Sequence, residues 1–396
     1  MSLQSNAQVE YKSSEDPIFD DIRPCRDNEV KGELEKIYND EELIDGIIRF
    51  KYPLLYRFAA FVLKPLVKAK LRNYCQTIKT IDDFQEKVAS YMRHMMHTTT
   101  DGVEFVGFDK LDNKKGYLFV SNHRDISLDP AFVDFGLHEC GFDTVRIAIG
   151  DNLLRIPAAT ALMRLNKSFI VKRKAMSPRE KLRAITTLSA YIGLSIKEGN
   201  SIWIAQREGR AKDGDDRTEI AVLKMFHMYG RTQKISFKDY IKTLNIVPVS
   251  ISYEYDPGDV AKANELNEKE QNGFYKKSEF EDIQSIVNGI RGYKGRVRVV
   301  AGSPIDADVE TPEELASIID KYIYENYAMF PTTLYALGQK DKIDENTLQV
   351  IEDRFKDIPL NIKQRVLSMY AMPYINRERM RRQETNDGLK NKTEDA

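Results

Sequence analysis

Cysteine is scarce in this chain of 396 residues, which contains three: Cys25, Cys75 and Cys140. Their spacing fits no metal-binding motif, and an odd number of thiols cannot all pair within one chain. A disulfide scaffold and a cysteine-ligated metal site are therefore excluded. We expect a reducing, cytoplasmic location and no bound metal.

Long apolar runs are also absent. No segment approaches the ~18 consecutive apolar residues of a membrane-spanning helix, and the polar start MSLQSNAQVEYKSS lacks the apolar core of a signal peptide. The net charge is only -1, so we expect no nucleic-acid partner and no overall attraction to an anionic membrane. Hydrophobic residues make up 42% and charged residues 31% of the chain, as in globular proteins with one large core or two to three domains.

One segment combines apolar and basic residues without any acidic one: GIIRFKYPLLYRFAAFVLKPLVKAKLRNY, residues 46–74. Its charges recur every few residues, so it cannot span a membrane. Two interpretations stay open. The segment lies on a membrane surface as a peripheral contact, or it is a helix packed on a domain and broken near Pro53 and Pro65.

The pattern of the chain predicts five regions. We expect a polar, loosely ordered N-terminus at 1–30, a helical region at 31–100, an α/β domain at 101–310, a helical extension at 311–375 and a polar tail at 376–396. In the α/β domain, short apolar runs such as GYLFVSNH, KSFIVKR and NSIWIAQREG alternate with helical segments. This alternation predicts a mostly parallel sheet flanked by helices. The sequence TPEE from Thr311 predicts the start of the helical extension.

Residues 121–136, SNHRDISLDPAFVDFG, contain the tripeptides HRD and DFG of protein kinases. A kinase needs an Asn where this chain has Pro130, and a second Asp on a later loop of its own. Asp134 follows Asp125 too closely for that, and no glycine-rich phosphate loop lies upstream. The sequence therefore does not predict a kinase.

Polar residues follow three of the apolar runs, and the carboxyl ends of strands are where α/β domains bind ligands. The three groups are Ser121-Asn122-His123, Lys172-Arg173-Lys174 and Gln206-Arg207-Glu208-Gly209-Arg210-Ala211-Lys212. A neutral imidazole opposite fixed cations suits the removal of a proton from a hydroxyl of a phosphorylated substrate. Simpler interpretations exist for each: an exposed histidine, a solvated basic face, and a helix opened by Asp129 as N-cap with Pro130 next.

The order of these runs resembles the glycerolipid acyltransferase superfamily, the glycerol-3-phosphate and 1-acylglycerol-3-phosphate acyltransferases. FVSNHRDISLDPA is similar to its first block, an Asn-His followed by an Asp, and LNKSFIVKR to its second. SIWIAQREGRAKDG is similar to the third block and IVPVSISYE to the fourth. The four blocks lie in the family's order over roughly 115–255.

The resemblance implies transfer of a fatty acyl group from acyl-CoA or acyl-carrier protein, as co-substrate and without a cofactor, to the hydroxyl of glycerol 3-phosphate or lysophosphatidate in phospholipid synthesis. His123 would be the base and Asp129 its partner, with backbone N–H groups at the start of the next helix as donors to the thioester oxyanion. Segment 46–74 is one candidate for the wall of an acyl groove. The implied phosphate ligands are Lys172, Arg173, Arg210 and Lys212, and further candidates are Asn122, Asp125, Lys174, Glu208 and Gly209.

Three departures from the family pattern affect these expectations. Five residues separate His123 from Asp129 where the family usually has four, so either the loop bulges or Asp125 takes part of the role. Asn166 stands at the usual Gly of the second block, and the third block reads Glu208-Gly209-Arg210 without an intervening residue. The alternatives are an acyltransferase of another lipid headgroup, through a hydroxyl or an amine, and a non-catalytic lipid-binding relative with a broken dyad. Because His123 and Arg210 are both retained, we expect an enzyme.

Overall fold

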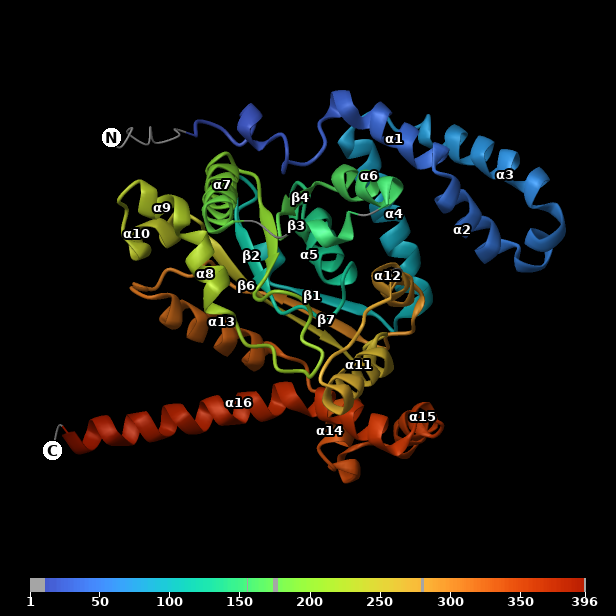
Figure 1. Ribbon diagram of the computed structural model, residues 1–396. Coiled ribbons are helices and arrows are strands. Elements are labelled where there is room, and N and C mark those ends of the chain that lie inside the picture. Colours follow the sequence, from blue (N-terminus) through green and yellow to red (C-terminus); the bar gives the residue numbers. More distant parts are fainter. Residues whose placement is uncertain (1–10, 155, 174–176, 279–280, 395–396) are drawn as a thin grey trace.

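The computed structural model describes residues 11–154, 156–173, 177–278 and 281–394. Within these residues, one seven-stranded sheet has the order β1-β7-β6-β2-β5-β3-β4. Neighbouring strands are parallel except for the antiparallel pair β6 and β7. The predicted α/β fold with a mostly parallel sheet is confirmed (Figure 1). The strands are β1 (Val103–Val106), β2 (Leu118–Ser121), β3 (Arg146–Gly150), β4 (Ser168–Val171), β5 (Ile202–Ala205), β6 (Ile246–Tyr253) and β7 (Val297–Ala301).

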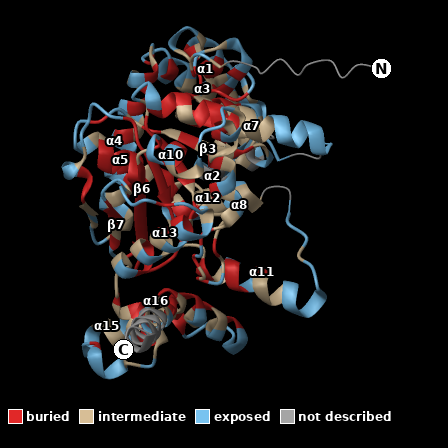
Figure 2. Cartoon of the chain, turned by 90° about the vertical axis from the view of Figure 1, so that its left-hand side faces the viewer, coloured by how far each residue is buried: buried red, intermediate tan, exposed pale blue. Residues whose placement is uncertain are grey.

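Helices cover both faces of the sheet, because neighbouring strand residues point to opposite sides. Leu118 and Ile202 pack in one core, and Phe119 and Trp203 pack in the other. Buried residues are accordingly concentrated along the strands in Figure 2. The first core is closed by α7 (Pro178–Lys197), α8 (Ile220–Phe226), α10 (Phe237–Lys242) and α13 (Pro312–Asn326), with α9 (Met228–Thr232) beside α7; the second is closed by α4 (Ile81–Thr99) and α5 (Leu128–Glu139).

The N-terminal segment is better packed than its composition suggests. Phe19 and Ile22 are buried in the core beside α7, and Cys25 is buried in a smaller cluster with α1 and α6. The expectation of loose order is therefore wrong for residues 11–30, because the average polarity of the segment hides a few apolar side chains that anchor it. Residues 1–10 lie outside the described residues.

Residues 31–100 form helices, of which two make a hairpin that extends away from the sheet (Figure 1). The break between these two helices falls at Tyr52, next to Pro53, as the sequence suggests. Pro65 lies inside the second helix, and the irregular backbone is at Ala59 instead. The helices of this region are α1 (Val30–Asn39), α2 (Glu41–Lys51) and α3 (Pro53–Cys75), with α4 following and α6 (Pro157–Leu165) packed on α1.

The C-terminal helices form a separate small core against α11 (Figure 1). The last helix runs through residue 376, where a polar tail was expected, and Asn376 is buried. The start at Thr311 is confirmed, since its hydroxyl accepts a hydrogen bond from Glu314 N at 3.2 Å. The remaining helices are α11 (Asp259–Asn272), α12 (Glu281–Arg291), α14 (Pro331–Ala336), α15 (Glu345–Phe355) and α16 (Leu360–Glu394). Among the described residues, no helix is both long enough and apolar enough to cross a membrane.

Candidate active site

Asn122 and His123 follow directly after β2, at the centre of the sheet. The Asn122 amide donates to Ile251 O at 2.9 Å, and its oxygen accepts from Ile251 N at 2.8 Å. These two bonds extend the pairing of β2 with β6 by one side chain. Asn122 therefore fixes the end of the strand and the starting point of the His123 loop, and it does not line the cavity.

The His123 ring is held by the carboxylate of Asp129, with Nδ1 at 2.8 Å from Oδ2. The same oxygen accepts hydrogen bonds from Arg124 N at 2.5 Å and Asp125 N at 2.8 Å. The other oxygen accepts the hydroxyl proton of Tyr253 at 2.7 Å. Asp129 is fully buried, so four contacts from two segments of the chain, the loop 123–125 and the end of β6, set the orientation of this carboxylate.

Asp125 ties the loop between His123 and Asp129, with its five intervening residues, to the start of the next helix. Its Oδ1 accepts from Ser127 N at 3.0 Å and from Leu128 N at 2.9 Å, and α5 begins at Leu128. Asp129 is therefore the second residue of the helix and not its N-cap, contrary to the expectation from Asp129-Pro130. Of the two carboxylates it is Asp129 that contacts His123, and burial together with Asp129 raises the pKa of Asp125.

The backbone N–H groups at this helix start are already engaged. Those of Arg124 and Asp125 donate to Asp129, and those of Ser127 and Leu128 donate to Asp125. The expectation that the start of the helix would offer oxyanion donors is therefore wrong for these four groups.

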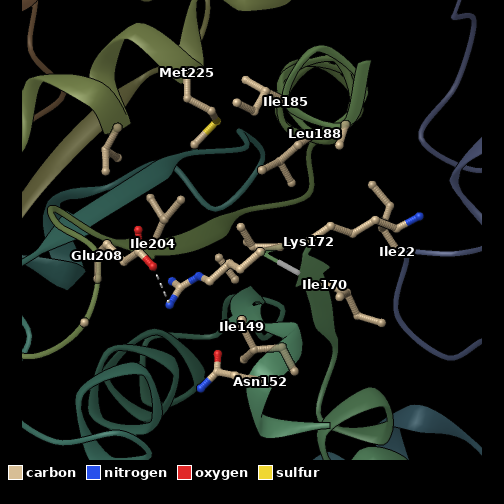
Figure 3. A pocket seen from close by; sticks show the side chains of 18 of the residues that line it. Ile22, Ile149, Asn152, Ile170, Lys172, Ile185, Leu188, Ile204, Glu208 and Met225 are labelled. Carbon is tan, nitrogen blue, oxygen red and sulfur yellow. Dashed lines mark ion pairs between the residues drawn. The ribbon is translucent and has the colours of Figure 1, made fainter. Parts of the chain in front are cut away.

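A cavity of about 990 Å³ opens beside His123 at the carboxyl ends of β3, β4 and β5 (Figure 3). Apolar lining residues come from the strands, from α7 and α8, and from the N-terminal segment at Ile22. The lining also includes His123, cations from the second and third sequence blocks, and the charged residues Glu180, Lys181 and Arg183 of α7. The labelled apolar side chains of Figure 3 are Ile22, Ile149, Ile170, Ile185, Leu188, Ile204 and Met225.

Two predicted phosphate ligands from the second block line this cavity, each paired with an acid. Lys172 Nζ lies 3.2 Å from Asp21 Oδ2, and Arg173 Nη1 lies 3.4 Å from Glu208 Oε1, the ion pair dashed in Figure 3. These side chains are all more than a third exposed, so the pairs are weak and water can compete for them. Lys174 lies outside the described residues.

The third block supplies Glu208, Gly209, Arg210 and Lys212 to the same cavity. Gly209 has a φ of +74°, a conformation that glycine adopts without strain, and it turns the chain between its neighbours. Arg210 Nη1 donates to Ser285 Oγ of α12 at 2.8 Å. Lys212 forms an ion pair with Glu265, and its pKa is lowered by burial.

Several residues of the site were not foreseen. Tyr253 lies at the end of β6, 124 positions from Asp129 in the chain, and although it belongs to the fourth block, nothing there marks it as a partner of Asp129. The ring of Trp203 on β5 stands edge-on to His123, with centroids 5.5 Å apart. Arg207 lines the cavity and donates through Nη1 to Asp215 O at 3.0 Å, while its Nε has no hydrogen-bond partner among the described residues. Arg207 stands in the quoted third block, which was the available signal.

Comparisons with known proteins identify the domain that holds this site. Residues 102–252 match the family model described as "Acyltransferase". No curated protein matches the chain in sequence. Among solved structures, the chain is similar to the 1-acyl-sn-glycerophosphate (LPA) acyltransferase PlsC from Thermotoga maritima, with 14% identity, 74% of this chain and 94% of that chain covered, and a TM-score of 0.35. A superposition this loose carries no argument about the fold or the substrate.

Proposed function

Starting from the match of residues 102–252 to the acyltransferase family model, we propose that the chain is an enzyme of the glycerolipid acyltransferase superfamily and transfers a fatty acyl group to the hydroxyl of glycerol 3-phosphate or lysophosphatidate. The acyl donor is acyl-CoA or acyl-carrier protein. The observation that carries the proposal is one cavity that joins His123, a cluster of cations and an apolar wall.

The proposed base is His123 Nε2, the ring nitrogen that Asp129 does not hold. It accepts the proton of the acceptor hydroxyl as that oxygen attacks the thioester carbon. The tetrahedral intermediate then collapses with cleavage of the C–S bond, and the imidazolium returns its proton to the leaving thiolate. Asp129 stabilises the imidazolium and keeps the ring in place. Because the acceptor hydroxyl attacks the thioester directly, no acyl-enzyme forms.

The proposed phosphate ligands are Arg210 and Arg173, with Lys172 and Lys212 beside them. Guanidinium groups suit this role because they donate parallel hydrogen bonds to two phosphate oxygens. Arg210 is held by the hydroxyl of Ser285 and not by a carboxylate in the contact that the structure gives it, so an incoming phosphate would meet its full charge. Fixing the phosphate brings the hydroxyl to the imidazole and converts binding energy into orientation.

The proposed acyl site is the apolar wall formed by β3, β4, β5, α7 and α8. The volume of the whole cavity, about 990 Å³, lies in the range of ligand pockets, ~300–1,000 Å³. Segment 46–74 was a candidate for this wall, but the described lining residues come from elsewhere in the chain. In this proposal the segment therefore does not form the acyl site, and membrane contact is the role left for it.

Lysophospholipids whose headgroup carries an ammonium are a second class of acceptor. Lys172, Arg173 and Lys212 each pair with a carboxylate, respectively Asp21, Glu208 and Glu265. The basic character of the cavity is thereby reduced, and Glu208 in particular is exposed enough to bind an ammonium group.

We further propose that α3 lies on an anionic lipid surface, with the enzyme on the cytoplasmic face of a membrane. Leu54, Phe58 and Phe61 are 82%, 83% and 78% exposed, and Leu66 is 60% exposed. No acidic residue occurs in 46–74, so the basic residues of the segment complement anionic headgroups. Such a location would bring the site to its lipid substrates.

The direct test measures transfer of labelled acyl groups from acyl-CoA and acyl-carrier protein to glycerol 3-phosphate, lysophosphatidate and lysophosphatidylethanolamine. We expect turnover with one acceptor and a loss of at least ~100-fold in kcat for His123→Ala. The control is His138→Ala, which removes an imidazole from α5 whose contact is Glu86 and should leave kcat unchanged. Equal rates for wild type and His123→Ala, or no transfer by folded wild type to any acceptor, would contradict the proposal.

A further inference from the structure

The loop that carries His123 buries a charged side chain beside it. Arg124 is 3% exposed, and its guanidinium lies 2.7 Å from Asp216 and above the ring of Tyr327, 5.6 Å from the centroid. A buried guanidinium is tolerated only where an opposite charge compensates the loss of water. The conformation of the loop therefore depends on the residues that surround the Arg124 guanidinium, Asp216 and Tyr327.

Lys262 of α11 holds the main chain of the same residue. Its ammonium donates to Arg124 O at 2.7 Å and forms an ion pair with Asp256, which follows β6. Both side chains of the pair are at most 7% exposed. Arg124 is thus held through its guanidinium on one side and through its carbonyl on the other.

Two side chains of the C-terminal helix α16 hold the segments that contact the Arg124 guanidinium and the Arg124 carbonyl. The Tyr370 hydroxyl accepts from Asp256 N at 2.8 Å and donates to Asp259 Oδ2 at 2.9 Å. The Asn376 amide donates to Asp215 Oδ1 at 2.9 Å, next to the Asp216 that pairs with Arg124. Tyr370 and Asn376 are both buried.

A close packing contact adds to these hydrogen bonds. At Gly214, where φ is +85°, a side chain would collide with the main chain of α16 at Met369. The loop of the third block therefore lies directly on α16. Helix α16 is outside the segment that matches the family model, so nothing in that match accounts for these contacts.

We propose that α16 is a positioning element of the catalytic loop: Tyr370 and Asn376 hold Asp256 and Asp215, and through Lys262 and the Asp216–Arg124 pair they fix the backbone that carries His123. The proposal rests on the proposed role of His123 as the base. Its physical basis is that a base must meet the hydroxyl within a few tenths of an ångström, and a slack loop lowers the fraction of productive encounters.

The test compares Tyr370→Phe with Tyr374→Phe, which removes a hydroxyl one turn later on the same helix, where the ring lies beneath Arg377. We expect kcat of Tyr370→Phe to fall about tenfold with KM unchanged, within the ~100-fold that a displacement of 1 Å can cost. Lys262→Met should lose more, and Tyr374→Phe should match wild type. If circular dichroism shows that Tyr370→Phe does not fold, Asn376→Ala takes its place, and we again expect kcat to fall about tenfold with KM unchanged.

A second readout does not depend on turnover. With ¹⁵N-labelled histidine, the His123 Nδ1 proton that is shared with Asp129 should be visible in wild type and Tyr374→Phe and should broaden or vanish in Tyr370→Phe. A change in this signal without wild-type turnover would support the positioning role while contradicting the acyl-transfer proposal. A folded Tyr370→Phe protein with wild-type kcat and an unchanged His123 signal would overturn the positioning role alone.

Discussion

The Tyr253 hydroxyl donates to Asp129 at 2.7 Å, on the carboxylate oxygen that does not contact His123. Tyr253 ends β6, and His123 follows β2, the neighbouring strand. The last residue of β6 and the second residue after β2 thus contact different oxygens of one buried carboxylate. The hydrogen bond from Tyr253 thus adds a contact from a second strand to those that Asp129 makes within its own loop.

Replacement of Tyr253 by Phe should weaken this arrangement without emptying the site. The ring packing remains, but one oxygen of buried Asp129 loses its donor, which costs about 1–3 kcal/mol of the free energy of unfolding. We expect kcat to fall severalfold, because the His123 ring is less firmly held. Denaturant unfolding and kinetics of the same preparation check both effects; an unchanged kcat with lowered stability would assign Tyr253 to the fold only.

The two carboxylates of the loop should respond differently to neutral replacement. Asp129→Asn removes the charge beside His123, so kcat should fall by about 10²–10⁴-fold. Asp125→Asn keeps an oxygen that can accept from Ser127 N and Leu128 N, so it should retain most of the activity. Steady-state kinetics of both variants test this difference. A larger loss of kcat in Asp125→Asn than in Asp129→Asn would assign the role of histidine partner to Asp125.

Glu208→Gln should increase the affinity for anionic acceptors. The change leaves Arg173 without its acidic partner, so a phosphate no longer competes with the Glu208 carboxylate. We expect KM for the anionic acceptor to fall about two- to fivefold, corresponding to the ~0.5–1 kcal/mol of an exposed pair, with kcat unchanged. Glu139→Gln, which frees Arg93 on another surface, serves as control. A rise in KM would instead indicate that Glu208 binds the acceptor.

Charged residues on α3 should abolish binding to membranes. In Phe58→Asp/Phe61→Asp, two of the most exposed apolar side chains become acidic and repel anionic lipid. Each lost phenyl ring removes about 1.5–3 kcal/mol of apolar burial if it is fully inserted, so sedimentation with phosphatidylglycerol vesicles should drop more than tenfold. Leu360→Asp, at a 72% exposed position of α16, should sediment like wild type. Equal sedimentation of all three proteins would refute the contact.

The free energy of unfolding should decrease as pH rises, because of Asp134. This buried carboxyl accepts from Val145 N at 2.6 Å, and burial raises its pKa to about 7. The folded state therefore binds more protons than the unfolded chain between about pH 4 and 7, and stability is lost as pH rises through that window. Asp134→Asn keeps the acceptor and removes the charge, so it should stabilise the protein at pH 8, by at most about 4 kcal/mol, and much less at pH 4.

Exposed Asp143 provides the control for that experiment. Thermal or denaturant unfolding of Asp143→Asn should follow wild type at both pH values. If the Asp134→Asn variant also follows wild type at both, the carboxyl does not titrate as its burial implies.

The sequence contains enough information for the sheet and for the edge on which the site lies, because strand ends follow from local apolar runs. His123, Arg173 and Arg210 each follow such a run within a few residues, and the structure brings them to one cavity. Contacts between distant segments were not predictable in this way. Nothing local to Tyr253 or Lys262 indicates that one reaches Asp129 and the other Arg124 O.

The helix start after His123 shows a different kind of error. Asp129-Pro130 is a good opening for a helix, but Asp125 offers the same chemistry four residues earlier and takes the exposed N–H groups first. The polar composition of residues 11–30 and of the tail likewise gave no indication that these segments pack. A few buried side chains are enough to anchor a segment that is polar on average.

The side chain of Asp125 gives the loop a tolerance in length. It ties the loop to the first turn of α5, and the His123 ring meets the Asp129 carboxylate at 2.8 Å although five residues separate the two in the chain. The reaction requires the histidine ring and the carboxylate to be in contact. A sequence pattern with a fixed number of residues between the two would therefore miss chains that make this contact with a loop of another length.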